Sequence, residues 1–355
     1  MGEHDILIMG ASYGSLLASK LLLAGHSVKL VCLPAEGELI NAEGFRVLMP
    51  VKGRQDPVEI DSRKLPGKVS AAGPADVDPS DYDLIGLAMQ EPQYRAPGVR
   101  QLLDRVARSG VPCMSIMNMP PLPYMQRIPG LNYDALKAAY TEPGIWDAFD
   151  PARLTLCSPD PPAIRPPNEM ANVLQVTLPT NFKVARFDGD APTAILKRLQ
   201  DDIEAVRLDT PQGKIELPVK LKLHASIFVP LAKWAMLLSG NYRCVTEDAP
   251  LTIKEAVHAD LDRSRSVYDF VVGLCLELGA SRDDLVPFEK YAAAALGLSR
   301  PSSAARALAN GAPDIERADK LVQLIARQKG MSHKVIDATV ALVDAKLQAN
   351  RSKAA

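Results

Sequence analysis

The sequence predicts an α/β fold, with an N-terminal Rossmann-like, doubly wound parallel sheet and an all-helical C-terminal domain. Three observations support this. The chain opens as strand, glycine turn, helix and strand, and β-like and helical patterns then alternate up to about residue 117. From Phe228 through Leu347 the apolar spacing is almost purely helical. Since 355 residues exceed one comfortable core, we expect two domains, 1–217 and 218–355.

The opening unit is the most informative part of the chain. An apolar run over 5–9 ends at Gly10, leucines and alanines at helical spacing follow Gly14, and Gly25 precedes a second apolar run over 28–32. This order is typical of the start of a dinucleotide-binding sheet, where N–H groups at the helix start hold a pyrophosphate. The predicted cofactor-binding residues of this turn are Gly10, Ala11, Ser12, Tyr13 and Gly14.

The turn matches only two of the three glycines of the usual G-x-G-x-x-G pattern. An ordinary strand–helix turn that holds no nucleotide is therefore the alternative. An acid about 20 residues past the glycines favours NAD, and a nearby arginine favours NADP. Glu36 comes slightly late for this role, and Lys29 and Arg46 are the nearest cations. The residues alone leave the choice of nicotinamide open.

Two further polar residues follow predicted strands. Gln90 comes after the apolar run over 83–88, and Asn118 comes after the run over 111–117. Ligands bind beyond the carboxyl ends of such strands, although loop capping explains each residue taken alone. The other elements expected in this half are a helix over 38–43, strands over 44–49 and 57–60, a helix over 94–107, a proline-rich irregular segment over 119–179, a strand over 181–187, a helix over 193–205 and a strand over 214–217.

Composition excludes several classes of function. A net charge of −1 gives no reason to expect nucleic acid or an anionic membrane as partner, and no apolar run reaches the ~20 residues of a spanning helix. The first residues lack the basic stretch of a signal peptide. Five scattered cysteines without C-x-x-C fit free thiols in a reducing cytoplasm, and the histidines lack metal-ligand spacing. We therefore expect a cytoplasmic protein with a small-molecule partner and no metal.

The helical half contains a polar set that could form a site. Lys233, Leu237 and Asn241 are spaced i, i+4 and i+8, which places them on one helix face. The segment around Lys233 is apolar, so this lysine either reaches out to solvent or serves a pocket. Downstream, Ser302 and Asp314 are typical helix caps, and nearby Glu316 suits the first turn of a helix.

Together these residues resemble the ketopantoate reductase (2-dehydropantoate 2-reductase) family, with the chain as a divergent member. The resemblance covers most of the sequence and is weakest over 119–217. It implies a dinucleotide-binding domain and a helical domain with the active site between them. It implies catalytic roles for Lys233 and Asp314, and substrate-binding roles for Asn118, Asn241 and Ser302. It also places the family's strand-end lysine on Gln90, which we assign to the cofactor together with Asn118.

The function implied is hydride transfer between a nicotinamide, NADPH rather than NADH by resemblance, and a 2-keto acid or related carbonyl. Lys233 would be the proton donor. Leu237 replaces a family asparagine and Asp314 a glutamate, and His224 lies in a lengthened stretch as a second candidate proton carrier, so we expect an altered substrate. Amphipathic stretches over 318–328 and 335–347, together with the resemblance, favour a homodimer. The alternatives are a nucleotide-binding sensor or scaffold that has lost catalysis, and an opine-type dehydrogenase.

Overall fold

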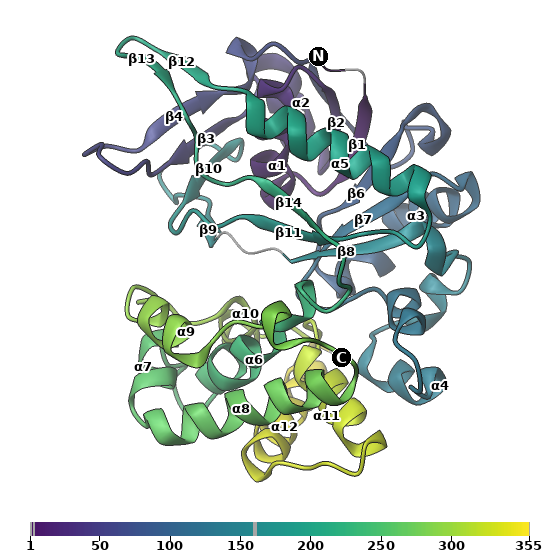
Figure 1. Ribbon diagram of the computed structural model, residues 1–355, viewed down its shortest axis with the longest axis vertical. Coiled ribbons are helices and arrows are strands. Elements are labelled where there is room, and N and C mark those ends of the chain that lie inside the picture. The colour runs from purple at the N-terminus through teal and green to yellow at the C-terminus, as the bar shows by residue number, and fades with distance from the viewer. Residues whose placement is uncertain (1, 3, 159–161, 355) are drawn as a thin grey trace. The chain divides into compact units, whose positions relative to one another are not determined.

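The computed structural model describes the whole chain except residues 1, 3, 159–161 and 355 (Figure 1). The chain forms two compact units. The first unit contains residues 1–89, 93–117 and 145–225, and the second contains 90–92, 118–144 and 226–355. The last passage into the second unit comes after Ala225, whereas the sequence placed one boundary between residues 217 and 218. Two segments from the first half of the chain also belong to the helical unit, which a single boundary cannot describe.

An eight-stranded sheet forms the centre of the first unit. All neighbouring strands are parallel except β8 and β11. Read from the β5 edge, the strands follow the order β5, β2, β1, β6, β7 and β8. Numbered by their place along the chain within this sheet, this is the order 3-2-1-4-5-6 of dinucleotide-binding sheets. This confirms the predicted Rossmann-like fold class. The strand order is β14 (Leu221–His224), β11 (Phe182–Ala185), β8 (Leu154–Ser158), β7 (Cys113–Ile116), β6 (Leu84–Leu87), β1 (Asp5–Met9), β2 (Ser27–Val31) and β5 (Val69–Ala72).

Helices cover both faces of this sheet (Figure 1). Helix α1 (Ser12–Leu23) connects β1 to β2, and α3 (Pro97–Ser109) connects β6 to β7. These two crossovers run in opposite directions along the sheet, so their common right-handedness places the helices on opposite faces. On the face of α1, helix α5 (Asp190–Ala205) shares one apolar core with it. The doubly wound arrangement therefore has the packing that the alternating pattern predicts.

The remaining elements of the first unit are peripheral to the large sheet. Helix α2 (Pro34–Glu43) follows β2 and packs beside β5. In a smaller sheet the two strands predicted over 44–49 and 57–60 pair with each other, with Met49 opposite Val58 in an antiparallel register. The smaller sheet has the order β4 (Val58–Asp61), β3 (Arg46–Met49), β10 (Val173–Val176) and β9 (Ala163–Ile164), and a separate hairpin joins β12 (Leu208–Thr210) to β13 (Gly213–Ile215).

The expectation of an irregular segment over 119–179 is wrong for three stretches that form strands. Strand β8 lies inside the large sheet, where all five of its residues are buried, and β9 and β10 belong to the smaller sheet. A short apolar run does not by itself distinguish a strand from other buried segments, and the prolines around this run obscured it. The helix expected from residue 94 begins instead at Pro97, because the fixed φ of proline suits the first helical position.

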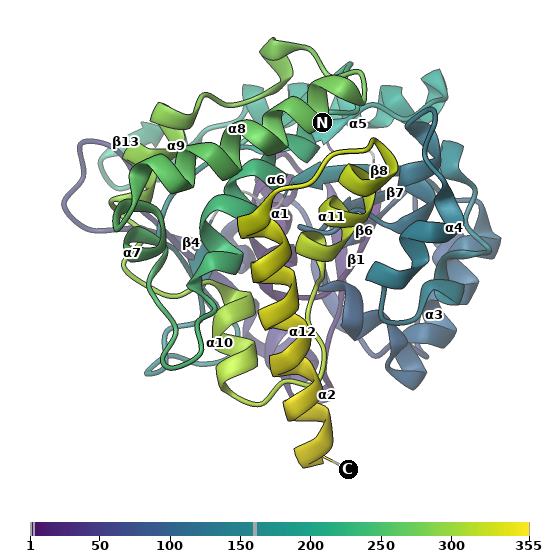
Figure 2. The same ribbon diagram turned by 90° about the horizontal axis from the view of Figure 1, so that it is seen from below.

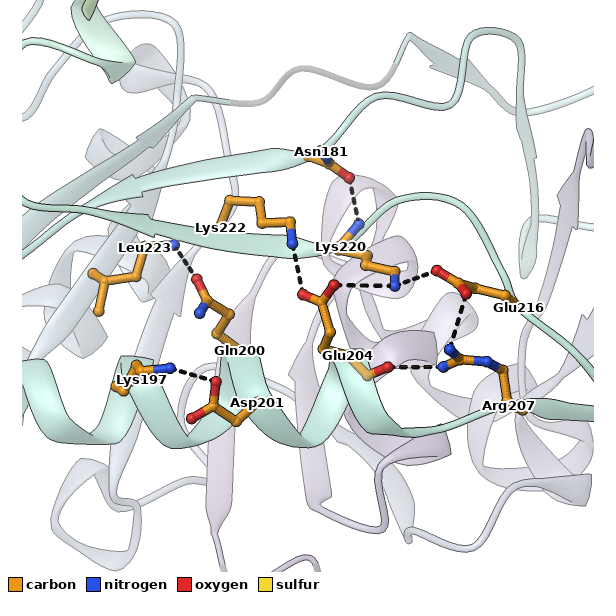
Figure 3. Close-up of polar contacts among 10 residues, drawn as sticks. All are labelled: Asn181, Lys197, Gln200, Asp201, Glu204, Arg207, Glu216, Lys220, Lys222 and Leu223. Atoms are coloured by element: carbon orange, nitrogen blue, oxygen red, sulfur yellow. Dashed lines mark hydrogen bonds and ion pairs between the residues drawn. The ribbon is translucent and has the colours of Figure 1, made fainter.

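A network of charged side chains attaches β14 to α5 (Figure 3). Glu204 of α5 accepts hydrogen bonds from Lys222 at 2.6 Å and Lys220 at 3.4 Å, and Lys220 also binds Glu216. The backbone N–H of Leu223 donates to the side-chain oxygen of Gln200 at 2.7 Å. Isolated surface pairs contribute little to stability. In this network, however, two carboxylates are shared among several cations, and together they hold the edge strand β14 against α5. The sequence does not predict this strand.

The described residues of the second unit form helices and turns without a strand, which confirms the all-helical C-terminal prediction. Figure 2 shows α12 running to the C-terminal end, and α12 packs beside α11. None of the described helices is long and apolar enough to cross a bilayer. The helices are α4 (Tyr133–Leu136), α6 (Lys233–Met236), α7 (Ile253–His258), α8 (Leu261–Glu277), α9 (Phe288–Ala295), α10 (Ser303–Ala309), α11 (Ala318–Gln328) and α12 (Lys334–Ala354), with a π-helical turn over Leu237–Asn241 directly after α6.

Candidate functional site

The glycine turn of the first unit lies where the strand order reverses. Gly10 has φ +104, and its N–H donates to the carbonyl oxygen of Val31 at 2.9 Å. A Cβ at this position would lie 2.6 Å from the carbonyl oxygen of Ala88, just past β6. Only glycine fits both the backbone angle and this close approach. The turn is thus held between the ends of β2 and β6, at the switch point where such sheets bind ligands.

The start of α1 has the features of an anion-binding site. The helix begins at Ser12, and its N-cap residue, Ala11, provides no side-chain hydrogen bond to the first turn. A Cβ on Gly14 would lie 2.8 Å from Cγ2 of Ile8, so glycine allows α1 to pack closely on β1. An N-terminus without a side-chain cap leaves its N–H groups available to an anion. These residues fit the pyrophosphate of a dinucleotide; the side chain of Tyr13 lies outside the described part.

Replacing Gly10 by alanine should destabilise the first unit and weaken nucleotide binding. The added methyl group would both strain the backbone and collide with the Ala88 carbonyl oxygen, and we expect a loss of at least about 2 kcal/mol in the free energy of unfolding. Gly53→Ala is the matched control, because Gly53 has φ +85 but a Cβ added there would meet no atom within 4 Å. Chemical denaturation and NADPH titration measure both effects. Equal losses in the two variants would contradict the proposed close approach.

The charged residues near the end of β2 differ from the sequence expectation. Glu36 lies in the first turn of α2 and forms an ion pair with Arg165, which follows β9. Arg46, one of the two cations nearest in sequence to this strand end, is held by Glu59 and Glu169, each at 3.6 Å. Sequence reasoning missed Arg165, because it is 129 residues from its partner and no local pattern marks it.

A small cavity in the second unit brings several predicted residues together. Its volume is about 20 Å³, which is room for about one water molecule. It therefore suits a single hydroxyl or carboxylate oxygen of a substrate. Three of the predicted residues, Gln90, Asn118 and Asn241, are among its lining residues. The full lining comprises Gln90, Asn118, Leu237, Asn241, Tyr242, Ser303, Ala304, Ile315 and Glu316.

The carboxylate in this cavity belongs to Glu316. It accepts hydrogen bonds from Nδ2 of Asn118 at 3.2 Å and from the backbone N–H of Glu91 at 3.4 Å. Burial raises the pKa of Glu316 to about 7, with a smaller upward contribution from the negative charge of Glu91, while the bond from Asn118 opposes the shift. The hydroxyl of Tyr242 donates to the backbone carbonyl oxygen of Glu316 and fixes this residue in place. Glu316 therefore changes charge near neutral pH.

Glu316→Gln should change how stability depends on pH. The pKa of this carboxyl is higher in the folded protein, about 7, than in the unfolded chain, about 4.3. The folded state therefore binds the extra proton in this window, and stability falls as pH rises from about 4.3 to 7, by about 4 kcal/mol in total. Glutamine does not titrate, so that part of the fall should disappear. Denaturation at a series of pH values measures it, with Glu277→Gln as an exposed control in the same unit; identical pH profiles for wild type and Glu316→Gln would contradict it.

Two residues predicted to bind or act on substrate lie outside the cavity lining. The carboxylate of Asp314 pairs with Arg351 of α12 at 2.6 Å, and the cavity carboxylate comes from two positions later in the chain. The hydroxyl of Ser302 is buried, donates to the carbonyl oxygen of Asn241 at 2.6 Å and accepts from the N–H of Ala305 at 3.2 Å. Ser302 thus caps α10, as the helix-cap interpretation of the sequence predicts. It also holds the backbone of Asn241 in place.

Lys233 and His224 also lie outside the cavity lining. Lys233 is the half-buried first residue of α6, and the π-helical turn over Leu237–Asn241 begins immediately after this helix. A π turn closes i→i+5 bonds, so Lys233 and Asn241 do not share one regular α-helical face. His224 is the half-buried last residue of β14 in the first unit. Among the described residues, no group of three or more metal-ligating side chains gathers to hold an ion.

The chain matches solved structures over nearly its full length. A protein of Ralstonia solanacearum provisionally described as a ketopantoate reductase shares 17% identity at a TM-score of 0.67, with 98% of both chains covered. The 2-dehydropantoate 2-reductase of Methylococcus capsulatus shares 11% identity at a TM-score of 0.65, covering 98% of this chain and 97% of the other. D-mandelate dehydrogenase, in a structure with NADH and anilino(oxo)acetate, shares 16% identity at a TM-score of 0.64. The match covers 98% of this chain and 99% of the other.

No protein-family model matches the sequence, and no curated protein matches it either. The structural likeness extends over both units, from the parallel sheet to the helices that follow it. It confirms the two-part fold that the sequence resemblance implied. The chain therefore has the fold of the ketopantoate reductases and of D-mandelate dehydrogenase.

Proposed function

We propose that this chain is an NADPH-dependent reductase of a 2-keto acid or a related carbonyl compound. The observation that carries the proposal is the presence of two matching parts in one chain. The first unit has the strand order and glycine turn of a dinucleotide-binding sheet, and the second has a cavity whose lining includes Asn118, Asn241 and Glu316. Structures with the same fold include a 2-dehydropantoate 2-reductase and a D-mandelate dehydrogenase with NADH, which is support from fold alone.

The chain's own residues divide the work. The N–H groups at the start of α1 bind the pyrophosphate, and the nicotinamide, when bound, supplies the hydride. Lys233 donates a hydrogen bond and then a proton to the substrate oxygen as negative charge develops on it. A half-buried ammonium is suited to this role, because it can both donate the proton and stabilise the developing negative charge. His224 stays a second candidate for carrying a proton.

The cavity residues determine which substrates fit. Asn118 and Asn241 provide amide groups, and Glu316 takes the place that the sequence assigned to Asp314. Leu237 and Ile315 make one part of the wall apolar, where the family pattern has an asparagine in place of Leu237. We infer that the cavity holds one hydroxyl or carboxylate oxygen of a substrate whose adjoining part is apolar. This substrate differs from ketopantoate.

Two experiments test the proposed function. NADPH and NADH are titrated into the protein while nicotinamide fluorescence is recorded, and turnover is then measured with a panel of 2-keto acids and imines. Binding with turnover of a keto acid supports the reductase, and preference for imines points to an opine-type dehydrogenase. Binding without turnover identifies a sensor or scaffold, and no binding of either nucleotide refutes the proposal. The homodimer and the cytoplasmic location stay predictions, and light scattering of the purified protein tests the first.

A further inference from the structure

The end of β2 lies directly beside the glycine turn in the first unit. The hydrogen bond from the N–H of Gly10 to the carbonyl oxygen of Val31 connects the two. In sheets of this order, the residues just past the second strand contact the ribose that carries the adenine. Here that position is occupied by the first turn of α2, which contains Glu36. Any adenosine-selecting residue of this chain is therefore expected around Glu36.

Glu36 itself is already engaged. Its carboxylate is paired with Nη2 of Arg165, and its side chain is only 11% exposed, compared with 37% for Arg165. A guanidinium has five N–H donors in a planar fork, and in the described part of the chain its only hydrogen bond is the one to Glu36. The carboxylate is thus covered, while the arginine presents its remaining donors to solvent.

A second feature of the same turn suits an adenosine group. Leu33, the N-cap residue of α2, is 75% exposed, more than any other large apolar side chain described. An exposed apolar side chain at this place provides a surface against which a flat adenine ring can pack. The other cations considered from the sequence are less suitable, because Arg46 is paired with two glutamates and Lys29 lies within β2.

We propose that Arg165 binds the 2′-phosphate of the adenosine part of NADP(H), with Glu36 orienting its guanidinium. An arginine fork matches a phosphate through two parallel charge-assisted bonds. A carboxylate paired in this way does not serve as the free acceptor that the 2′-hydroxyl of NAD requires. The arginine comes from the segment after β9 instead of the turn after β2. This inference rests on the proposed function and names the residue that selects its cofactor.

Binding measurements test the assignment without any substrate. Wild type and Arg165→Ala are titrated calorimetrically with NADPH, NADH, 2′,5′-ADP and 5′-AMP. We expect Arg165→Ala to bind NADPH and 2′,5′-ADP about 10–100-fold more weakly, the loss typical of a charge-assisted contact, and to bind NADH and 5′-AMP within about twofold of wild type. Arg165→Lys should restore only part of the loss, because an ammonium lacks the planar fork. Arg46→Ala is the matched control and should leave all four affinities unchanged.

The outcomes separate this inference from the proposed function. If wild type binds none of the four nucleotides, the proposed function fails. If wild type binds NADPH and Arg165→Ala weakens all four equally, or none, the inference fails and the function stands. A selective loss of NADH in Glu36→Gln, with Arg165→Ala unchanged, would assign the ribose to Glu36 and overturn the inference. Thermal melting of each variant shows that lost binding does not reflect lost folding.

Discussion

Replacing Lys233 by alanine is expected to lower the rate of carbonyl reduction by about 10²–10⁴-fold, the usual scale for removing a general acid. The ammonium both donates the proton and stabilises the negative charge that develops on the substrate oxygen. Lys233 is half-buried at the start of α6, and the turn that directly follows this helix carries Leu237 and Asn241 into the cavity lining. Steady-state kinetics with NADPH and the most active 2-keto acid of the panel measures the effect.

The controls for Lys233 separate chemistry from binding. Lys233→Ala should retain the wild-type affinity for NADPH, because the nucleotide is assigned to the glycine turn of the other unit. Lys254→Ala removes a lysine that is exposed on α7 of the same unit and should leave the rate unchanged. A Lys233→Ala variant with nearly wild-type turnover would remove this residue from the mechanism. A loss confined to KM would give it a substrate-binding role only.

The sequence predicts those parts of the fold in which apolar residues repeat with a clear helical or strand-like spacing. Two apolar runs, two glycines and a helical pattern predict the opening unit, and β1, α1 and β2 occupy those places. The sequence does not predict strand β8, because all five of its residues are buried, Thr155 and Ser158 included, and because it lies in a proline-rich region. Strand pairing, rather than local propensity, identifies such a segment.

The site was predictable where a residue follows a regular element and not where it depends on long-range packing. The sequence predicts Asn118 and Gln90 because each follows a buried strand. The sequence pattern predicts Glu316 only as a first-turn acid, and the family resemblance assigns its role to Asp314 instead. The spacing of Lys233, Leu237 and Asn241 predicts a regular helix and not the π turn that follows α6. The pairing of Arg165 with Glu36 brings together parts of the chain 129 residues apart.

Arg317→Ala should destabilise the second unit by about 3–5 kcal/mol, the cost of leaving a buried charge without its partner. Nε and Nη2 of Arg317 bind both oxygens of Asp319, at 2.9 and 3.0 Å, and Nη1 binds Asp344 of α12. The side chain of Asp319 is only 1% exposed, so solvent cannot replace the lost guanidinium. Because Arg317 directly follows Glu316, the same bonds fix the backbone that carries the cavity carboxylate.

Denaturation can be followed in each unit separately, because the chain has two tryptophans, Trp146 in the first unit and Trp234 in the second. In a Trp146→Phe background the remaining fluorescence reports the second unit. Arg327→Ala breaks an exposed pair between α11 and Asp337 of α12, with side chains 59% and 39% exposed, and should cost less than about 1 kcal/mol. The double variant Arg317→Met with Asp319→Leu should recover most of the stability, because apolar side chains can replace a buried ion pair. A single Arg317→Ala change as mild as Arg327→Ala would show that α11 and α12 are held by their apolar faces alone.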